Sequence, residues 1–172
     1  MDIETHPFEP FLPKNAKLIL LGTFPPAPKR WCMEWYYPNF MNDMWRIIGL
    51  CFFGDKNHFV KPGEKTWRLD ELKVRRTKGT ASDKDLEVIE QADIDGLLHY
   101  LSQCRAVLCA GQLATTIFTS HYGIRDAKKM KMGSFVNFDF EGRTLRLYRE
   151  PSSSRAYPMK VEKKAEYYSK MF

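Results

Sequence analysis

The chain has 172 residues, of which 44% are hydrophobic, 28% charged and 14% aromatic. This composition excludes a disordered polypeptide, a collagen-like repeat and a disulfide-stabilised miniprotein. No apolar run approaches the roughly 20 residues of a membrane span, and the acidic start MDIETHPFEP lacks the basic and apolar regions of a signal peptide. The length predicts a core of its own, so we expect a single domain over residues 1–172, located in the cytoplasm.

The positive charge is concentrated near the C-terminus. The formal net charge is +6, but residues 1–124 carry 15 basic and 15 acidic side chains, whereas residues 125–172 carry 12 and 6. A basic region beside a neutral one fits binding to a polyanion, because phosphate neutralisation supplies much of the affinity for nucleic acid. A solvated surface with spare lysines explains the charge equally well.

The cysteines do not have the spacing of metal ligands. They stand at positions 32, 51, 104 and 109, and no CxxC pair is present. We therefore expect reduced, mostly buried thiols and no metal or iron–sulfur cluster.

The first part of the chain predicts a strand, a loop and a helix. Residues 16–21 form an apolar run typical of a buried strand, which Gly22 and the prolines after it end. Residues 42–53 carry apolar side chains at helical spacing, with Asn42 as a candidate N-cap. Residues 55–79 are rich in lysine, arginine and glycine and predict a long surface excursion.

The middle of the chain predicts helices around a second strand. The sequence from Ser82 to Leu86 is typical of a capped helix start, and Asp93 is placed to begin a second helix. Residues 106–110 indicate a short buried strand, and Gly111 turns it into an amphipathic helix.

The last part predicts a hairpin and a terminal helix. Residues 135–140 and 144–148 alternate between apolar and polar around the turn Glu141-Gly142. Residues 160–172 predict a helix. Because strands and helices interleave along the whole chain, we expect an α/β sandwich.

Two loops qualify as ligand-binding loops. In open α/β sheets, ligands bind beyond the carboxyl ends of the strands. The loops that follow the first and last predicted strands are Gly22-Thr23-Phe24-Pro25-Pro26 and Pro151-Ser152-Ser153-Ser154-Arg155.

These loops resemble the motifs of the uracil-DNA glycosylase superfamily, in which Gly-x-x-Pro follows the first strand and Pro-Ser follows the last. Between them, residues 36–45 (YYPNFMNDMW) resemble the branch of hypoxanthine-DNA glycosylases and related mismatch-type enzymes. Residues 106–111, with Ala114, resemble the next strand and helix of that branch. The resemblance covers most of the chain and implies a three-layer α/β/α sandwich with a central, mostly parallel sheet.

The resemblance also implies an activity. It is that of a monofunctional DNA glycosylase, a hydrolase that removes a damaged or deaminated base, such as uracil or hypoxanthine, in base-excision repair after flipping it from the duplex. The implied partner is DNA, bound by a monomer without cofactor or metal. The alternative is a catalytically inactive nucleic-acid-binding protein with the same fold. A serine hydrolase is not favoured, because the sequence has no G-x-S-x-G elbow.

The site residues that the resemblance implies form three sets. The catalytic residue is Asn42, whose amide would orient water. The base and substrate would be bound by Gly22, Thr23, Phe24, Pro25 and Tyr37, with Phe24 or Tyr37 stacking on the base. DNA would be bound by Ser152, Ser153, Ser154 and Arg155, with Arg155 filling the gap in the base stack or pairing with a phosphate.

Each set also has a purely structural explanation. Phe24 and Tyr37 can be packing residues, Asn42 can be only a helix cap, and the three serines can form an ordinary loop.

Three residues depart from the pattern of the superfamily. Phe24 stands where many members place Asp or Asn, and Ala110 stands where the branch tends to place a second Asn. Glu150 precedes Pro-Ser, where His or Asn is common. An ionised carboxylate there would oppose a base that leaves as an anion, so Glu150 either points away from the pocket or is held protonated.

Overall fold

A computed structural model describes residues 6–22, 24–70, 93–124 and 130–172. Thr23, expected to bind the base, and the helix start expected at residues 82–86 lie outside the described residues. Within the described part, every helix is too short or too polar to span a membrane.

The centre of the protein is a four-stranded sheet in the order β1-β2-β4-β3. Its strands are β1 (Leu18–Leu21), β2 (Ala106–Ala110), β3 (Ser134–Phe140) and β4 (Arg143–Glu150). β1, β2 and β4 are parallel, and β3 runs antiparallel to β4. This confirms the mostly parallel sheet, with β1 starting two residues later than the sequence predicts and β4 continuing two residues further.

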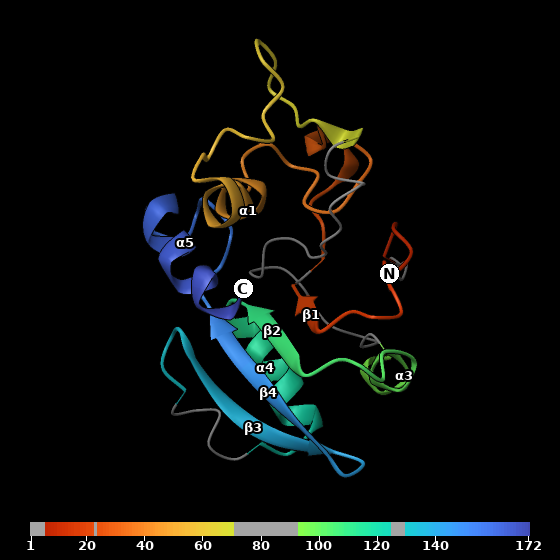
Figure 1. Ribbon diagram of the computed structural model, residues 1–172. Coiled ribbons are helices and arrows are strands. Elements are labelled where there is room, and N and C mark those ends of the chain that lie inside the picture. Colours follow the sequence, from red (N-terminus) through yellow and green to blue (C-terminus); the bar gives the residue numbers. More distant parts are fainter. Residues whose placement is uncertain (1–5, 23, 71–92, 125–129) are drawn as a thin grey trace.

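The three parallel strands end at the same edge of the sheet. Leu21 lies opposite Cys109, and Ala110 lies opposite Glu150. The heads of the three arrows point the same way in Figure 1. The loops after β1 and β4 therefore emerge at one edge, on either side of the end of β2.

The hairpin turn between β3 and β4 is confirmed. Glu141 and Gly142 have φ angles of +50° and +77°, the left-handed backbone that two-residue hairpins require and glycine adopts readily. Asp139 Oδ1 accepts a hydrogen bond of 3.1 Å from the Gly142 amide. The turn thereby fixes the register that places alternate residues of β4 on opposite faces.

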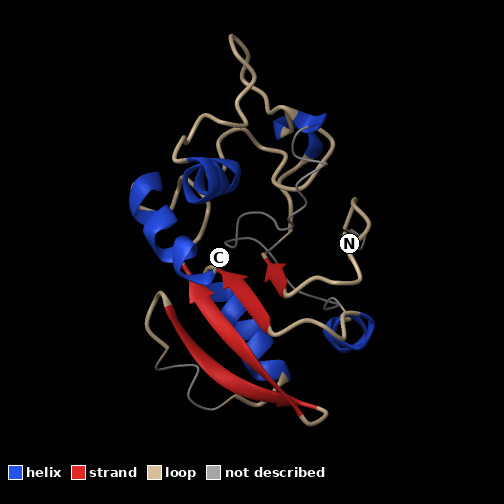
Figure 2. Cartoon of the chain, in the orientation of Figure 1, coloured by secondary structure: helices blue, strands red, loops and turns tan. Residues whose placement is uncertain are grey.

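Helices cover both faces of the sheet. The helices α1 (Met44–Phe53) and α5 (Val161–Tyr168) pack on the face that carries Leu20 and Leu108, around the fully buried Trp45. The helices α3 (Ile94–Tyr100) and α4 (Gln112–His121) pack on the face that carries Val107 and Leu147. Figures 1 and 2 show α4 behind the sheet and α1 beside α5 above its upper edge. The three-layer α/β/α sandwich is confirmed.

The ends of the helices agree with the sequence to within a few residues. Asp93 caps α3, because its carboxylate accepts a 2.8 Å hydrogen bond from the Gly96 amide. α1 begins at Met44, two residues after the predicted start, and Asp43 takes the N-cap position. The terminal helix ends in a 3-10 turn, Ser169–Met171, and another 3-10 turn spans Pro28–Arg30.

Part of the predicted surface excursion belongs to the core. Val60 and Trp67 form an antiparallel bridge, and Phe59 and Trp67 are buried. The sequence does not show this, because Phe59 and Trp67 are separated by polar residues. They are buried by α1 and the segment before it. All four cysteines are free; Cys104 and Cys109 are buried, whereas Cys32 and Cys51 are half-buried.

Candidate functional site

The segment before α1 lies against the loop after β4. Asn42 and Ser154 form an antiparallel bridge, and the Asp43 amide donates a 2.8 Å hydrogen bond to the Ser153 carbonyl. The candidate catalytic residue and the loop Pro151-Ser152-Ser153-Ser154-Arg155 (the serine loop) are therefore neighbours in space, although more than half of the chain separates them in sequence.

Three charged side chains fix this junction. Asp43 is only 5% exposed, and its Oδ2 lies 3.0 Å from Nζ of Lys164, which is 0% exposed. Lys164 also donates a 2.8 Å hydrogen bond to the Ser154 carbonyl. The Arg155 Nε donates to Asp43 Oδ1 at 2.9 Å. Since buried charges are stable only when paired and hydrogen-bonded, this arrangement holds the start of α1, the serine loop and α5 in one geometry.

Sequence reasoning did not identify Asp43 and Lys164. A signal for Lys164 is present, because Val161, Ala165 and Tyr168 form a helical stripe and Lys164 stands within it at the i+3 position. A lysine inside the buried stripe of a helix implies a buried acidic partner. Nothing in the sequence says that the partner is Asp43.

Asn42 has one capping contact and one free group. Its Oδ1 accepts a 2.9 Å hydrogen bond from the Met44 amide, so it satisfies one of the free N–H groups at the start of α1. Its Nδ2 has no partner within the described residues, and the side chain is half-buried. Because a carbonyl oxygen accepts two hydrogen bonds, the amide can cap the helix and also hold a water molecule.

The serine loop has hydroxyl groups available as donors. The Ser154 amide donates to Ser152 Oγ and the Ala156 amide donates to Ser154 Oγ, both at 3.2 Å. Each hydroxyl thus accepts from the backbone and retains its own O–H for a further partner. Ser153 is buried, and its carbonyl is used by Asp43.

Gly111 allows the serine loop to approach the start of α4. It has a φ of +102°, and a Cβ built on it would lie 3.4 Å from the Cβ of Ser152. The backbone angle favours glycine at this position, and an added Cβ would come into van der Waals contact with Ser152.

The aromatic candidates differ in accessibility. Phe24 is half-buried and contacts His6 edge to face at a centroid distance of 5.7 Å. Tyr37 is 1% exposed, has a φ of +53° and packs edge to face on Trp45 at 6.1 Å. The Tyr37 ring lies in the core, so we retain Phe24 as the candidate stacking surface. In the same loops, Gly22 is half-buried and Pro25 is buried.

Glu150 is an interior carboxyl group. It is 2% exposed, and its Oε2 has no hydrogen-bond partner within the described residues. Burial raises the pKa of Glu150 to about 7, although the charge of Lys170 partly offsets this. Its neighbour Tyr168, whose own pKa is raised by burial and by the charge of Glu150, donates a 2.9 Å hydrogen bond to the Pro151 carbonyl. This environment favours the protonated form of Glu150 at pH values below about 7.

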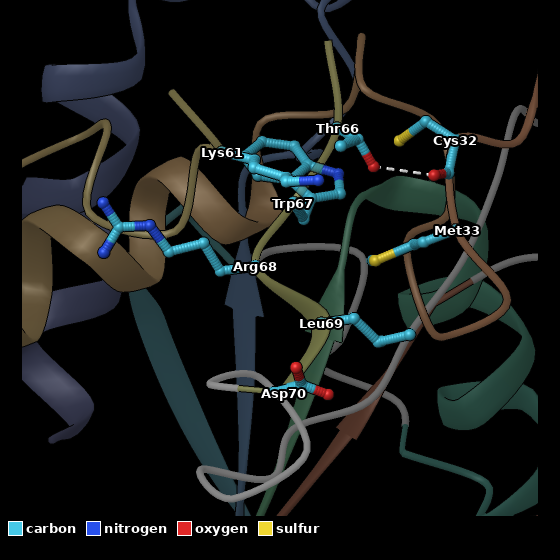
Figure 3. Close-up of a pocket in the computed structure, with 8 residues that line it drawn as sticks. All are labelled: Cys32, Met33, Lys61, Thr66, Trp67, Arg68, Leu69 and Asp70. Atoms are coloured by element: carbon cyan, nitrogen blue, oxygen red, sulfur yellow. Dashed lines mark hydrogen bonds between the residues drawn. The ribbon is translucent and has the colours of Figure 1, made fainter. Parts of the chain in front are cut away.

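Two hollows mark the surface near α1. The larger, about 680 Å³, lies between Cys32-Met33 and residues 66–70, where Thr66 Oγ1 donates to the Cys32 carbonyl at 2.7 Å. Figure 3 shows its lining, which contains none of the expected site residues that the structure describes. The smaller, about 490 Å³, is lined by Asp43, Arg155 and further basic side chains.

The described residues contain no group of three or more His, Cys, Asp or Glu side chains placed to hold a metal ion.

Comparisons with known proteins identify a fold. No family model matches the sequence, and no curated protein matches it. Among solved structures, the chain is similar to the solution NMR structure of "a putative Uracil DNA glycosylase" from Methanosarcina acetivorans. The TM-score is 0.53 at 20% sequence identity, and the match covers 93% of this chain and 92% of that one. At this identity the likeness shows the fold, in agreement with the expected α/β/α architecture.

Proposed function

We propose that this chain is a monofunctional DNA glycosylase that hydrolyses the N-glycosidic bond of a damaged or deaminated base in DNA, as in base-excision repair. The observation that carries the proposal is the contact between the Asn42 segment and the serine loop. Asn42 and Ser154 form a backbone bridge at the edge where the parallel strands end. Ligands of open α/β sheets bind at that edge, and the similar solved structure supports the same activity.

The reaction needs few groups from the protein. Cleavage of the base–sugar bond develops positive charge on the sugar and negative charge on the base, so an oriented water and a preorganised polar environment lower the barrier. The Asn42 carboxamide can orient that water, because its Oδ1 retains a lone pair beside the contact with Met44. The chain's own side chains suffice for this step.

The surrounding residues have matching roles. Phe24 stacks on the flipped base, and the hydroxyl groups of Ser152 and Ser154 donate hydrogen bonds to backbone phosphates. A neutral Glu150 leaves no negative charge beside Pro151 to oppose an anionic leaving base, and its raised pKa of about 7 favours that neutral form at lower pH. We propose uracil or hypoxanthine as the base, from the resemblance of residues 36–45 to the hypoxanthine-type branch.

A catalytically inactive nucleic-acid-binding protein is the second candidate. Ala110, buried at the end of β2 opposite Glu150, offers only a methyl group where the branch tends to have a carboxamide. Phe24 likewise offers no polar group to water.

One experiment separates the candidates. The protein is incubated with labelled duplexes that contain uracil, hypoxanthine, xanthine or a thymine mismatch, and abasic sites are then cleaved with alkali. An enzyme gives strand scission with at least one base. Binding to every duplex without scission of any would contradict the proposed activity and support the inactive binder.

A further inference from the structure

The smaller hollow beside Asn42 and Asp43 has a basic lining. Arg46 from α1, Arg155 from the serine loop, Lys160 before α5 and Lys56 border it, and Asp43 is its acidic residue. The residues come from four separate segments, so the fold and not a local run of charge brings them together.

Arg46 is held rigidly at this hollow. It is 7% exposed, and its guanidinium lies over the adjacent rings of Phe40 and Trp67, at 4.5 and 4.6 Å from their centroids. One of its nitrogens, Nη1, donates to the Phe40 carbonyl at 3.0 Å and to the Asn42 carbonyl at 3.3 Å. A guanidinium stacked in this way is ordered before any ligand arrives, which reduces the entropy lost on binding.

The charges at the hollow are not balanced. Both oxygens of Asp43 are engaged, one by Arg155 and the other by Lys164. Lys56 is paired with Glu162 at 2.7 Å, whereas Arg46 and Lys160 have no ion-pair partner in the described part of the chain.

The burial of Arg46 and, to a smaller extent, the nearby charge of Arg155 lower the pKa of Arg46 to about 10, so it remains charged at neutral pH. Positive charges gathered in a partly buried place are unfavourable unless an anion joins them.

We propose that this hollow binds a phosphate oxyanion, supplied by a backbone phosphodiester of a nucleic acid. The planar guanidinium of Arg46 matches a phosphate with two parallel N–H donors, and the first turn of α5 beyond Lys160 adds its favourable dipole. Because Arg46 contacts the Asn42 carbonyl, the phosphate lies within one helical turn of the candidate catalytic amide. As a site for the substrate backbone, the inference rests on the proposed function.

The test uses an undamaged duplex, so its result does not depend on base release. Fluorescence anisotropy measures the affinity of the full chain for a labelled duplex between about 50 and 200 mM salt. The variants are Arg46→Met and the exposed Lys160→Met, with Arg105→Met as a control at the amino end of β2, the opposite edge of the sheet.

Each hollow variant should lower the salt slope of log affinity by about 1 and weaken binding about tenfold near 0.1 M salt, because one phosphate contact is lost. Arg105→Met should leave both values unchanged. Thermal unfolding shows whether Arg46→Met is folded. If it is not, Lys160→Met decides the test.

Calorimetry with inorganic phosphate tests whether the hollow binds a phosphate of the nucleic-acid backbone or free phosphate. Salt slopes that match the wild-type value in both hollow variants would overturn the inference. If those variants leave duplex binding unchanged but the protein binds inorganic phosphate, the hollow would be assigned to free phosphate instead. If the hollow variants lower the salt slope of log affinity but the wild-type protein releases no base, the phosphate site is supported and the glycosylase activity is contradicted.

Discussion

The ammonium group of Lys164 lies 3.0 Å from the carboxylate of Asp43, in the interior of the protein. The contact joins the last helix to the residue that precedes α1, and through the Ser154 carbonyl it also joins the loop after β4. Three segments of the chain, one of them 121 residues away in sequence, thus converge on one ammonium group. The position of Asn42 relative to the serine loop depends on this pair.

Removing Lys164 should therefore be costly. Lys164→Met leaves the Asp43 carboxylate buried without its interior partner, and loss of one member of such a pair costs about 3–5 kcal/mol. Urea unfolding measures this loss. The control is Lys163→Met, which removes an exposed lysine whose partner Glu166 lies on the surface, and should cost less than about 1 kcal/mol.

The double variant Asp43→Asn/Lys164→Met refines the result, since it removes both charges together. Its loss of stability should be smaller than the sum of the two single losses, because neither charge of the buried pair remains and Arg155, which also loses Asp43, is partly exposed to water. Equal losses for Lys164→Met and Lys163→Met would show that the pair contributes nothing.

Glu150 should make stability depend on pH. Its pKa rises from its ordinary value of 4.5 to about 7 in the folded chain, so between these values the folded state retains a proton that the unfolded state has lost. Stability from this group is therefore highest below pH 4.5, falls as the pH rises to about 7, and is constant above that. The total change is about 3 kcal/mol, at about 1.4 kcal/mol for each pH unit.

Glu150→Gln removes this ionisation. The variant should be more stable than the wild type at pH 8, and the difference should shrink to less than about 1 kcal/mol at pH 5. The free energy of unfolding at the two pH values is the measurement, with the exposed Glu166→Gln as a control that changes little. An advantage of the same size at both pH values would mean that Glu150 is ionised in the fold.

Elements specified by nearby residues could be predicted from the sequence. β1 and β2 are short apolar runs, the β3–β4 turn has Glu-Gly at its centre, and Asp93 stands before α3 as an N-cap. In each case the pattern lies within a few residues of the element that it specifies.

Features that depend on distant residues could not be predicted. The burial of Lys164 requires Asp43, and the contact between Asn42 and the serine loop requires the sheet to place both at one edge. Val60 and Trp67 pair across a polar segment whose composition is typical of a surface loop. A resemblance of sequence motifs predicted the candidate site residues. Only the three-dimensional structure shows the residues that position them.

Gly111→Ala should affect stability and the site together. At a φ of +102° an alanine is strained, at a cost of about 1–3 kcal/mol, and its Cβ would contact the Cβ of Ser152 at 3.4 Å, so relief of the strain would move the serine loop. Gly142→Ala is the matched control, because it also has a positive φ but no atom within 4 Å of its added Cβ. Both variants should lose stability, and only Gly111→Ala should also weaken binding to a DNA duplex. Equal DNA affinity in the two variants would show that DNA binding by the serine loop does not depend on the approach of Ser152 to Gly111.

Chelation should not affect base release. The proposed step uses a water molecule held by Asn42 and the charge of the substrate, so neither a metal ion nor a cofactor takes part. Base release is measured before and after dialysis against a chelator, together with metal analysis of the purified protein. A stoichiometric metal that is lost together with activity would contradict the proposed chemistry.

The decisive variant for the proposed reaction is Asn42→Ala. If the amide orients the attacking water, base release in a single turnover should fall about a hundredfold or more, the scale of losing one preorganised polar group, while DNA affinity changes little. The hydrogen bond from the Met44 amide to Asn42 Oδ1 gives the same variant a second effect, a loss of about 1 kcal/mol in stability from the missing cap.

Asn42→Ser distinguishes these two effects, because serine is also a favoured cap but has no amide group. A catalytic Asn42 predicts that the serine variant is nearly as stable as the wild type and as slow as the alanine variant. Single-turnover base release and thermal unfolding, measured on all three proteins, give both quantities. Normal turnover in the serine variant, with a lowered melting temperature only in the alanine variant, would leave Asn42 with the capping role alone.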